Sequence, residues 1–324
     1  MSPDLFERLV AEAALAPSVH NTQPARWRLE NDGVLLFEDL SCRLAAADAE
    51  GHDAAISMGA ALEGMVLAAG SAGLVTNITR DHTRHDGLQA HARLTFSEGK
   101  VTDPLANAVH ERRSWRGAFV PPRDTDRSAS QTLAGDDRII LAAPGKVAEI
   151  AKLCDQASLG FMMQTPFRNE LLSWMRLSPS HRRWGVDGLN ADALHLNRIE
   201  RFFAGVLLGP AFGVVRRLGL APIVLSEASK SRSATAILVF HRPEHEDLLD
   251  TGRAFYRAWL HCEALGFGAA VLAALADDPN ASETLGKMAG VPNGRRIVSV
   301  FRIGRRPAHD PVPRARQRVA DLIV

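Results

Sequence analysis

Two stretches of the chain resemble each other and decide the fold: Gly59–Gly73, GAALEGMVLAAGSAG, and Gly252–Gly266, GRAFYRAWLHCEALG. They align without gaps at an offset of 193 residues, with four identities: Gly59 with Gly252, Ala61 with Ala254, Leu67 with Leu260, and Gly73 with Gly266. Apolar residues recur in the first stretch at helical spacing, and its many small residues let another helix approach closely. A strand candidate precedes each stretch, GVLLFED in one case and ATAILVF in the other. This repeated order predicts a chain of two related halves.

The segments around these helices predict antiparallel strands. Asn31-Asp32-Gly33 separates two short strand candidates and is a strong hairpin signal. The first stretch belongs to a buried helix expected at 53–74. The other expected elements are a helix at 3–15, strands at 27–30, 34–38, 75–80 and 91–96, and a late strand at 296–303. The fold class is therefore α+β, with an antiparallel sheet and packed helices in each half.

The composition describes an ordinary globular protein. The chain has 324 residues, of which 46% are hydrophobic and 23% charged, so it can bury a large core. Its net charge of +1 gives no global field for nucleic acid or an anionic membrane, and neither is expected as a partner. Three widely spaced cysteines and an acidic N-terminal segment predict a cytoplasmic location. Fusion of two halves removes one reason to self-associate, so we expect a monomer.

The most apolar segment, FFAGVLLGPAFGVV at 202–215, is shorter than the roughly 20 residues that a membrane-spanning helix needs. Two alternatives remain for it, a buried pair of helices or an apolar flap over a ligand.

The loop APSVHNTQP, at 16–24, follows the first predicted helix and is rich in hydrogen-bonding side chains. Two prolines stiffen its backbone. Ser18, Asn21 and Gln23 offer donors and acceptors that suit the edge of a planar heterocycle. The alternative is a plain connector between helix and strand with capping residues.

Two basic segments have a common pattern, RRSWR from residue 112 and PRARQR near the C-terminus. In extended chain, Arg112, Ser114 and Arg116 point to one side, and Arg314 and Arg316 alternate in the same way. Guanidinium groups beside a hydroxyl form a phosphate grip. A solvated helix end and a solvated tail are the alternative interpretations.

Together the three segments resemble the nitroreductase family of flavoproteins. The A-P-S-x-x-N-x-Q-P loop is similar to the loop after the family's first long helix, and R-R-S-x-R is similar to its opening phosphate motif. Here the loop precedes the basic motif, whereas the order within one family subunit is the reverse. This reversed order indicates the Acg-type branch of the family, whose members are fused pseudo-dimers with an apolar lid. The resemblance implies a first half at 1–103 and a second at 104–324, with a lid insertion at about 170–225.

In nitroreductase dimers each flavin lies at the interface and takes its loop from one subunit and its basic residues from the other. The resemblance implies that one complete FMN site remains here and that the second is lost. The implied cofactor-binding residues are Pro17, Ser18, Asn21 and Gln23 of the first half and Arg112, Ser114, Arg116, Gly266, Arg314 and Arg316 of the second. Two departures concern the reacting end of the flavin: Ala25 follows Gln-Pro where the family usually has Trp, and Ala273-Ala274 stands where dimeric relatives often have Glu-Gly.

The resemblance implies an enzyme that uses NAD(P)H to reduce nitroaromatic, quinone or enone acceptors by a ping-pong flavin mechanism. No catalytic side chain is expected, because the flavin carries the chemistry. The alternative is an FMN storage or sequestering protein with a closed lid, and a third hypothesis has no flavin. No metal site is expected, since His82-x-x-His85 and His241-x-x-x-His245 lack further ligands at suitable spacing.

Overall fold

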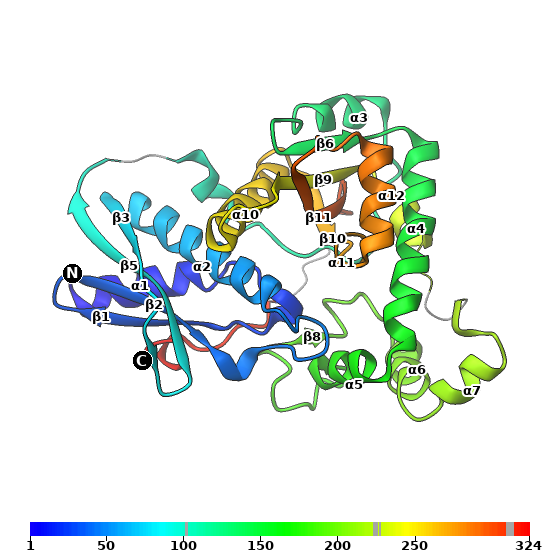
Figure 1. Cartoon of the computed structure of the whole chain (residues 1–324), viewed down its shortest axis with the longest axis horizontal. Coiled ribbons are helices and arrows are strands. Elements are labelled where there is room, and N and C mark those ends of the chain that lie inside the picture. The colour runs from blue at the N-terminus through cyan, green and yellow to red at the C-terminus, as the bar shows by residue number, and fades with distance from the viewer. Residues whose placement is uncertain (101–102, 223–225, 227, 309–313) are drawn as a thin grey trace.

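The computed structural model describes residues 1–100, 103–222, 226, 228–308 and 314–324. It contains two antiparallel sheets with helices between and around them (Figure 1). One continuous hydrophobic core joins residues of both sheets to the central helices. The expected α+β fold of two related halves is confirmed.

The first half is a five-stranded sheet with two helices. Its strand order is β1-β2-β5-β3, and β4 also pairs with β5. The Asn31-Asp32 turn closes the β1–β2 hairpin, in which Glu30 pairs with Gly33. The elements are α1 (Pro3–Ala13), β1 (Ala25–Glu30), β2 (Gly33–Asp39), α2 (His52–Ser71), β3 (Leu74–Arg80), β4 (Arg84–His85) and β5 (Leu88–Glu98), with short 3-10 turns η1 (Val19–Asn21), η2 (Leu40–Cys42) and η3 (Pro104–Ala108).

The second half repeats the connectivity of the first. Its sheet has the order β6-β9-β11-β10, and β10 follows the long helix α10 as β3 follows α2. The elements of this repeat are α3 (Asp124–Gln131), β6 (Arg138–Leu141), β9 (Ala236–Pro243), α10 (Leu248–Ala264), β10 (Gly268–Val271), α11 (Ala274–Asp277), α12 (Pro279–Ala289), β11 (Arg295–Gly304) and η4 (Val319–Asp321).

A long insertion separates β6 from β9, where the first half has only a two-residue turn between β1 and β2. The insertion includes the expected lid region. In Figure 1 its outer part extends away from both sheets. Its elements are α4 (Pro144–Met163), α5 (Thr165–Trp174), β7 (Met175–Arg176), β8 (Leu189–Asn190), α6 (Arg198–Leu208), α7 (Phe212–Arg217) and α9 (Ala228–Arg232).

The helices α2 and α10 cross in the centre of the molecule at two glycines. A Cβ atom on Gly59 would lie 2.2 Å from the carbonyl oxygen of Leu249, and one on Gly252 would lie 2.2 Å from that of Ile56. Ile56 and Leu249 are themselves related by the repeat offset of 193 residues. The contact is therefore reciprocal, as at the interface of a twofold dimer.

The C-terminal tail returns from the second half to the first. Trp27 donates its backbone N–H to Leu322 O at 2.8 Å, and Val324 donates to Trp27 O at 2.9 Å. These bonds add a short parallel bridge to the edge of β1. The tail residues 314–318 are thereby held beside the 16–24 loop.

The predicted elements agree with the observed ones to within a few residues, but the apolar 202–215 segment does not lie where either alternative placed it. It forms α6 and α7, and Phe202 and Phe203 are exposed to solvent. By length and hydropathy, α2 is the one described helix that could cross a membrane, and 67% of that window is buried in the protein.

Candidate functional site

A cavity of about 430 Å³ opens between the two halves and the insertion. This volume lies within the range of small-molecule and cofactor sites. The start of α2 and the 16–24 loop form one wall, and the 112–116 segment with the C-terminal tail forms another. Residues of α4, α5 and the 188–193 segment close the third side.

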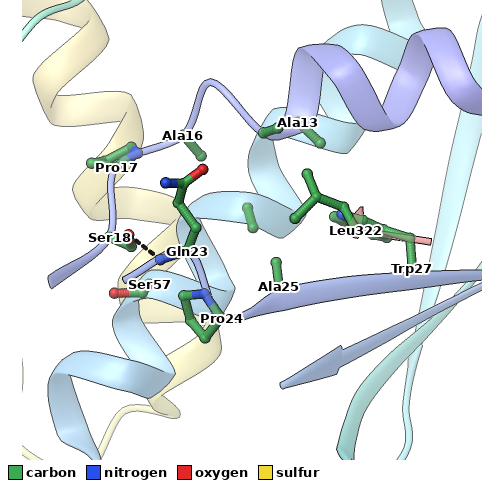
Figure 2. A pocket seen from close by; sticks show the side chains of 12 residues that line it. Ala13, Ala16, Pro17, Ser18, Gln23, Pro24, Ala25, Trp27, Ser57 and Leu322 are labelled. Atoms are coloured by element: carbon green, nitrogen blue, oxygen red, sulfur yellow. Dashed lines mark hydrogen bonds between the residues drawn. The ribbon is translucent and has the colours of Figure 1, made fainter. Parts of the chain in front are cut away.

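The cavity brings together eight of the ten residues proposed for the site. Gln23 and Gly266 do not line it. Gln23 instead lines a much smaller neighbouring pocket, to which Ser57 and Trp27 also contribute (Figure 2). The eight lining residues are Pro17, Ser18, Asn21, Arg112, Ser114, Arg116, Arg314 and Arg316.

The 16–24 loop holds a strained backbone at the cavity. His20, Asn21 and Gln23 have positive φ angles of 44°, 56° and 54°. Such angles are uncommon for residues other than glycine, and they cluster at ligand sites when the surroundings enforce them. Ser18 Oγ helps to enforce them by accepting the Gln23 N–H at 2.9 Å, as Figure 2 shows.

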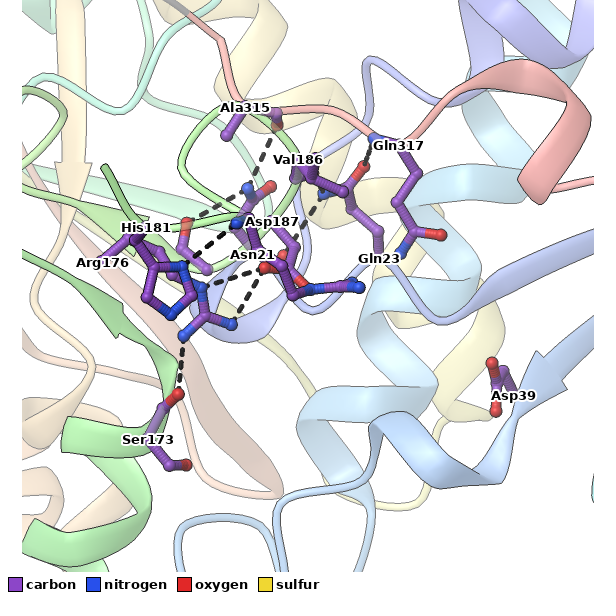
Figure 3. Close-up of polar contacts among 12 residues, drawn as sticks. Asn21, Gln23, Asp39, Ser173, Arg176, His181, Val186, Asp187, Ala315 and Gln317 are labelled. Carbon is purple, nitrogen blue, oxygen red and sulfur yellow. Dashed lines mark hydrogen bonds and ion pairs between the residues drawn. The ribbon is translucent and has the colours of Figure 1, made fainter. Parts of the chain in front are cut away.

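The amides of Asn21 and Gln23 are used within the protein. Asn21 Nδ2 donates to Gly188 O and Ala315 O, each at 3.2 Å. Gln23 Nε2 donates to Val186 O at 2.8 Å (Figure 3). Its Oε1 accepts the backbone N–H of Gln317 at 3.0 Å. The loop therefore holds both the insertion and the C-terminal tail as a clamp. The sequence predicted that these amides contact a heterocycle and did not predict this structural role.

A buried ion pair next to this clamp joins two segments of the insertion. Arg176 Nη2 lies 2.9 Å from Asp187 Oδ1, and both side chains are almost completely buried. Arg176 also donates to Ser173 O at 2.6 Å (Figure 3). The pair holds Asp187 against β7, next to Gly188 on the cavity wall.

Three guanidinium groups lie at the cavity wall next to this clamp. Arg112 donates to Leu15 O at 2.9 Å and lies over the Trp259 ring at 4.7 Å. Arg314 donates to three carbonyl oxygens, those of Val109, His110 and Arg112. Arg316 donates to Ala14 O and Asn21 Oδ1.

These three arginines have no carboxylate within ion-pair distance among the described residues. Burial, with the charge of Arg112 next in size, lowers the pKa of Arg314 and of Arg316 to about 9. Burial also lowers the pKa of Arg112. The Nε atoms of Arg112 and Arg314 are buried without a hydrogen-bond partner. Such a cluster of like charges is stabilised by a bound anion.

The 112–116 segment is held by the second sheet. Trp115 donates its backbone N–H to Ala269 O at 2.8 Å, and Ser114 forms a parallel bridge to the same residue of β10. Gly266 makes the turn that begins this strand, with a φ of +73°, and a Cβ there would lie 2.6 Å from Arg305 Nη1. Gly266 therefore supports the site from outside the cavity.

Two carboxylates on the cavity wall were not predicted. Asp53 is at the start of α2 and Asp277 at the end of α11. Burial raises the pKa of both carboxyl groups. The negative charge of Asp48 raises the pKa of Asp53 further, and the charges of Asp53 and Asp48 raise that of Asp277 further. No sequence pattern joins two carboxylates this far apart, so only the fold reveals the pair.

His20 also faces the cavity. Burial, followed by the charge of Arg116, lowers its pKa to about 4, so the ring is neutral near pH 7. Its Nδ1 atom is buried without a partner. Among the described residues, no group of three or more His, Cys, Asp or Glu side chains could hold a metal ion.

The chain is similar over most of its length to proteins of Mycobacterium tuberculosis. It is 27% identical to "Putative NAD(P)H nitroreductase acg" of strain H37Rv, over 98% of this chain and 94% of that protein. A second protein of that strain, "Putative NAD(P)H nitroreductase Rv3131", is 29% identical over 50% of this chain and 48% of its own length. No protein-family model matches the chain.

One solved structure shows the fold. A "putative nitroreductase" from Anabaena variabilis covers 94% of this chain and 88% of its own, with a TM-score of 0.50 and 12% sequence identity. The chain thus has the nitroreductase fold in a single-chain, two-half form. Within that class, its resemblance to the Acg-type proteins is confirmed.

Proposed function

We propose that the chain binds one FMN in the cavity between its halves and is an NAD(P)H-dependent oxidoreductase. The observation that carries the proposal is the cluster of three arginines without a carboxylate partner, at one end of a cavity of cofactor size. The names of the Mycobacterium tuberculosis relatives support the electron donor and the reaction class.

The arginine cluster fits the phosphate of FMN. A phosphate monoester carries about −1.5 to −2 charges at pH 7 and offers three acceptor oxygens. Arg112 and Arg314 each have a buried Nε donor without a partner, and together with Arg316 they supply a positive charge without a carboxylate partner among the described residues. Ser114 lines the same wall and adds a hydroxyl. Arg is well suited to this contact because its planar fork can bind two phosphate oxygens at once.

The rest of the cavity fits a planar ring system. Its apolar walls include Phe161, Met162, Phe167, Leu189 and Leu272. Bound FMN would supply hydride transfer between NAD(P)H and a nitroaromatic, quinone or enone acceptor in two successive half-reactions. The protein would orient these molecules and exclude water. Burial raises the pKa of Asp53 and of Asp277, which favours their protonated forms, and a protonated carboxyl group there would be placed to donate a hydrogen bond to a ligand oxygen.

A second candidate function is FMN storage or sequestration with little turnover. The clamp favours it, because Asn21 and Gln23 hold Gly188 and Val186 at the wall of the cavity and would restrict movement of the insertion to admit a bulky nicotinamide cofactor. The two functions share the same FMN site and differ only in access to it.

An anaerobic visible spectrum separates these functions. The purified protein is loaded with FMN, freed of excess, and recorded before and after NADH and then NADPH are added. Bound flavin that bleaches rapidly with either donor supports the oxidoreductase. Bound flavin that stays oxidised with both supports storage, and absence of bound flavin overturns the proposal.

A further inference from the structure

An apolar surface without a partner covers the outer face of the insertion. Six of the eleven large apolar side chains that are exposed in the described part of the chain lie within residues 199–220. Phe202 is 68% exposed and Leu218 66%. We call this surface the apolar patch, and its residues are Ile199, Phe202, Phe203, Val214, Leu218 and Leu220. Contiguous exposed apolar patches usually mark a site of interaction.

The patch is the free side of helices whose other side is anchored. On α6, Gly205 packs against Leu177, while Ile199, Phe202 and Phe203 follow the i, i+3, i+4 pattern of one exposed helix face. On α7, Phe212 is buried under the guanidinium group of Arg168, at 4.0 Å. Figure 1 places both helices at the outer end of the insertion, away from the two sheets.

Positive charges border the patch. Arg198, Arg216 and Arg217 are exposed, and no carboxylate among the described residues forms an ion pair with them. The one acidic side chain of α6, Glu200, is already used to accept the backbone N–H of Asn197 at the start of the helix. The outer face of the insertion is therefore both apolar and basic.

We propose that the apolar patch docks on the surface of an anionic lipid membrane. Short helices with aromatic and aliphatic residues on one face and arginines along its border lie in the plane of such a surface, with the apolar face buried in it. The arginines are then attracted to the acidic head groups. The net charge of +1 does not oppose this, because the attraction is local to one face.

Charge also argues against a second copy of the chain as the partner. A twofold contact through the patch would bring the same basic border in from both copies, so that positive charge would accumulate at one interface. An anionic bilayer offers the opposite sign. It also accepts Phe and Leu side chains without requiring a complementary shape.

Docking would bring the membrane next to one wall of the cavity. Leu171 of α5 lines the cavity, and its neighbour Leu172 contacts Gly209, between α6 and α7. The same short stretch of α5 thus separates the patch from the cavity. The proposal rests on the surface alone and holds whether or not the chain binds FMN.

Vesicle flotation of the full chain tests the proposal. The vesicles are phosphatidylcholine with or without phosphatidylglycerol, and the wild type should float only with the anionic vesicles. F202S/L218S should lower the partition coefficient at least tenfold. R216Q/R217Q should lower it about fivefold for each charge removed. L265S is the matched control, because Leu265 is 42% exposed but lies far along the chain, at the end of α10, and it should float like the wild type.

Circular dichroism of each variant checks that the fold is kept. Failure of the wild type to float, or equal flotation of F202S/L218S and the wild type, overturns the proposal. Light scattering of the soluble protein supplies the other test. A dimer that F202S/L218S converts to monomers would assign the patch to a second copy and would also overturn docking on lipid.

Discussion

Replacing Arg314 by glutamine separates a phosphate grip from a structural arginine. The Arg314 guanidinium group is partly buried among Arg112 and Arg113, which lower its pKa together with burial. A hydrogen bond to a charged group contributes about 1.5–3 kcal/mol. If Arg314 contacts the phosphate, the dissociation constant for FMN should rise about 10- to 150-fold in R314Q.

The stability of the FMN-free protein should change much less. R314Q removes bonds to three carbonyl oxygens, but it also removes a charge that repels its neighbours, and glutamine keeps one donor group. These effects oppose each other, so the melting temperature should stay within about 5 °C of the wild type. A structural arginine would instead lower stability and FMN affinity together.

The assay is a fluorescence titration of the FMN-free chain with FMN, beside a thermal melt of the same sample. R318Q is the control, since Arg318 lies four residues away with a side chain 83% exposed and paired to Asp321 at 2.8 Å. Exposed pairs contribute about 1 kcal/mol or less. R318Q should therefore bind FMN like the wild type. An R314Q dissociation constant within twofold of the wild type would refute the assigned grip.

Three further predictions concern stability. G252A should lower the free energy of unfolding, measured in urea, by about 2–3 kcal/mol, because its Cβ would lie 2.2 Å from Ile56 O. G286A, with nothing within 4 Å of the new Cβ, should raise that free energy by about 0.5–1 kcal/mol. Equal effects of the two variants would contradict the close helix crossing. The melting temperature of the wild type should fall as the pH is lowered from about 6.5 to 4, because His20 binds a proton at a higher pH in the unfolded chain than in the folded chain. The melting temperature of H20N should fall less over the same range, and asparagine tolerates the positive φ at this position. The folded-state pKa of Asp53 lies above its usual range, so the wild type loses stability as the pH rises above about 4. D53N should therefore melt at a higher temperature than the wild type at pH 8 but not at pH 4. A difference in melting temperature that does not change with pH would exclude ionisation of Asp53 as its cause.

The fold could be predicted because its signals are local or repeated. The Asn31-Asp32 turn and the helical spacing of α2 depend on neighbours in sequence, and the repeat relates α2 to α10 directly. The outer position of α6 and α7 could not be predicted from their composition, because apolar residues give the same pattern whether they are covered or exposed.

The site was predicted in part for a similar reason. Loop and arginine motifs are short, so they can be recognised in sequence, and eight of their residues meet at one cavity. Gln23 was placed there for its hydrogen-bonding side chain and Gly266 by resemblance, yet both support the site from outside the cavity. Asp53 and Asp277 were missed, because their pairing depends on how α2 and α11 pack and leaves no motif.

The reciprocal contact of Gly59 and Gly252 has a consequence for how this molecule can change. In a dimer of identical subunits one altered codon changes the residue on both sides of the symmetry axis, so an unfavourable substitution destabilises the interface at two places. Here each glycine has its own codon, so a substitution at one of them introduces one clash at the crossing rather than two. Covalent fusion thus lets the halves diverge into separate roles without losing the architecture that once required them to be equal.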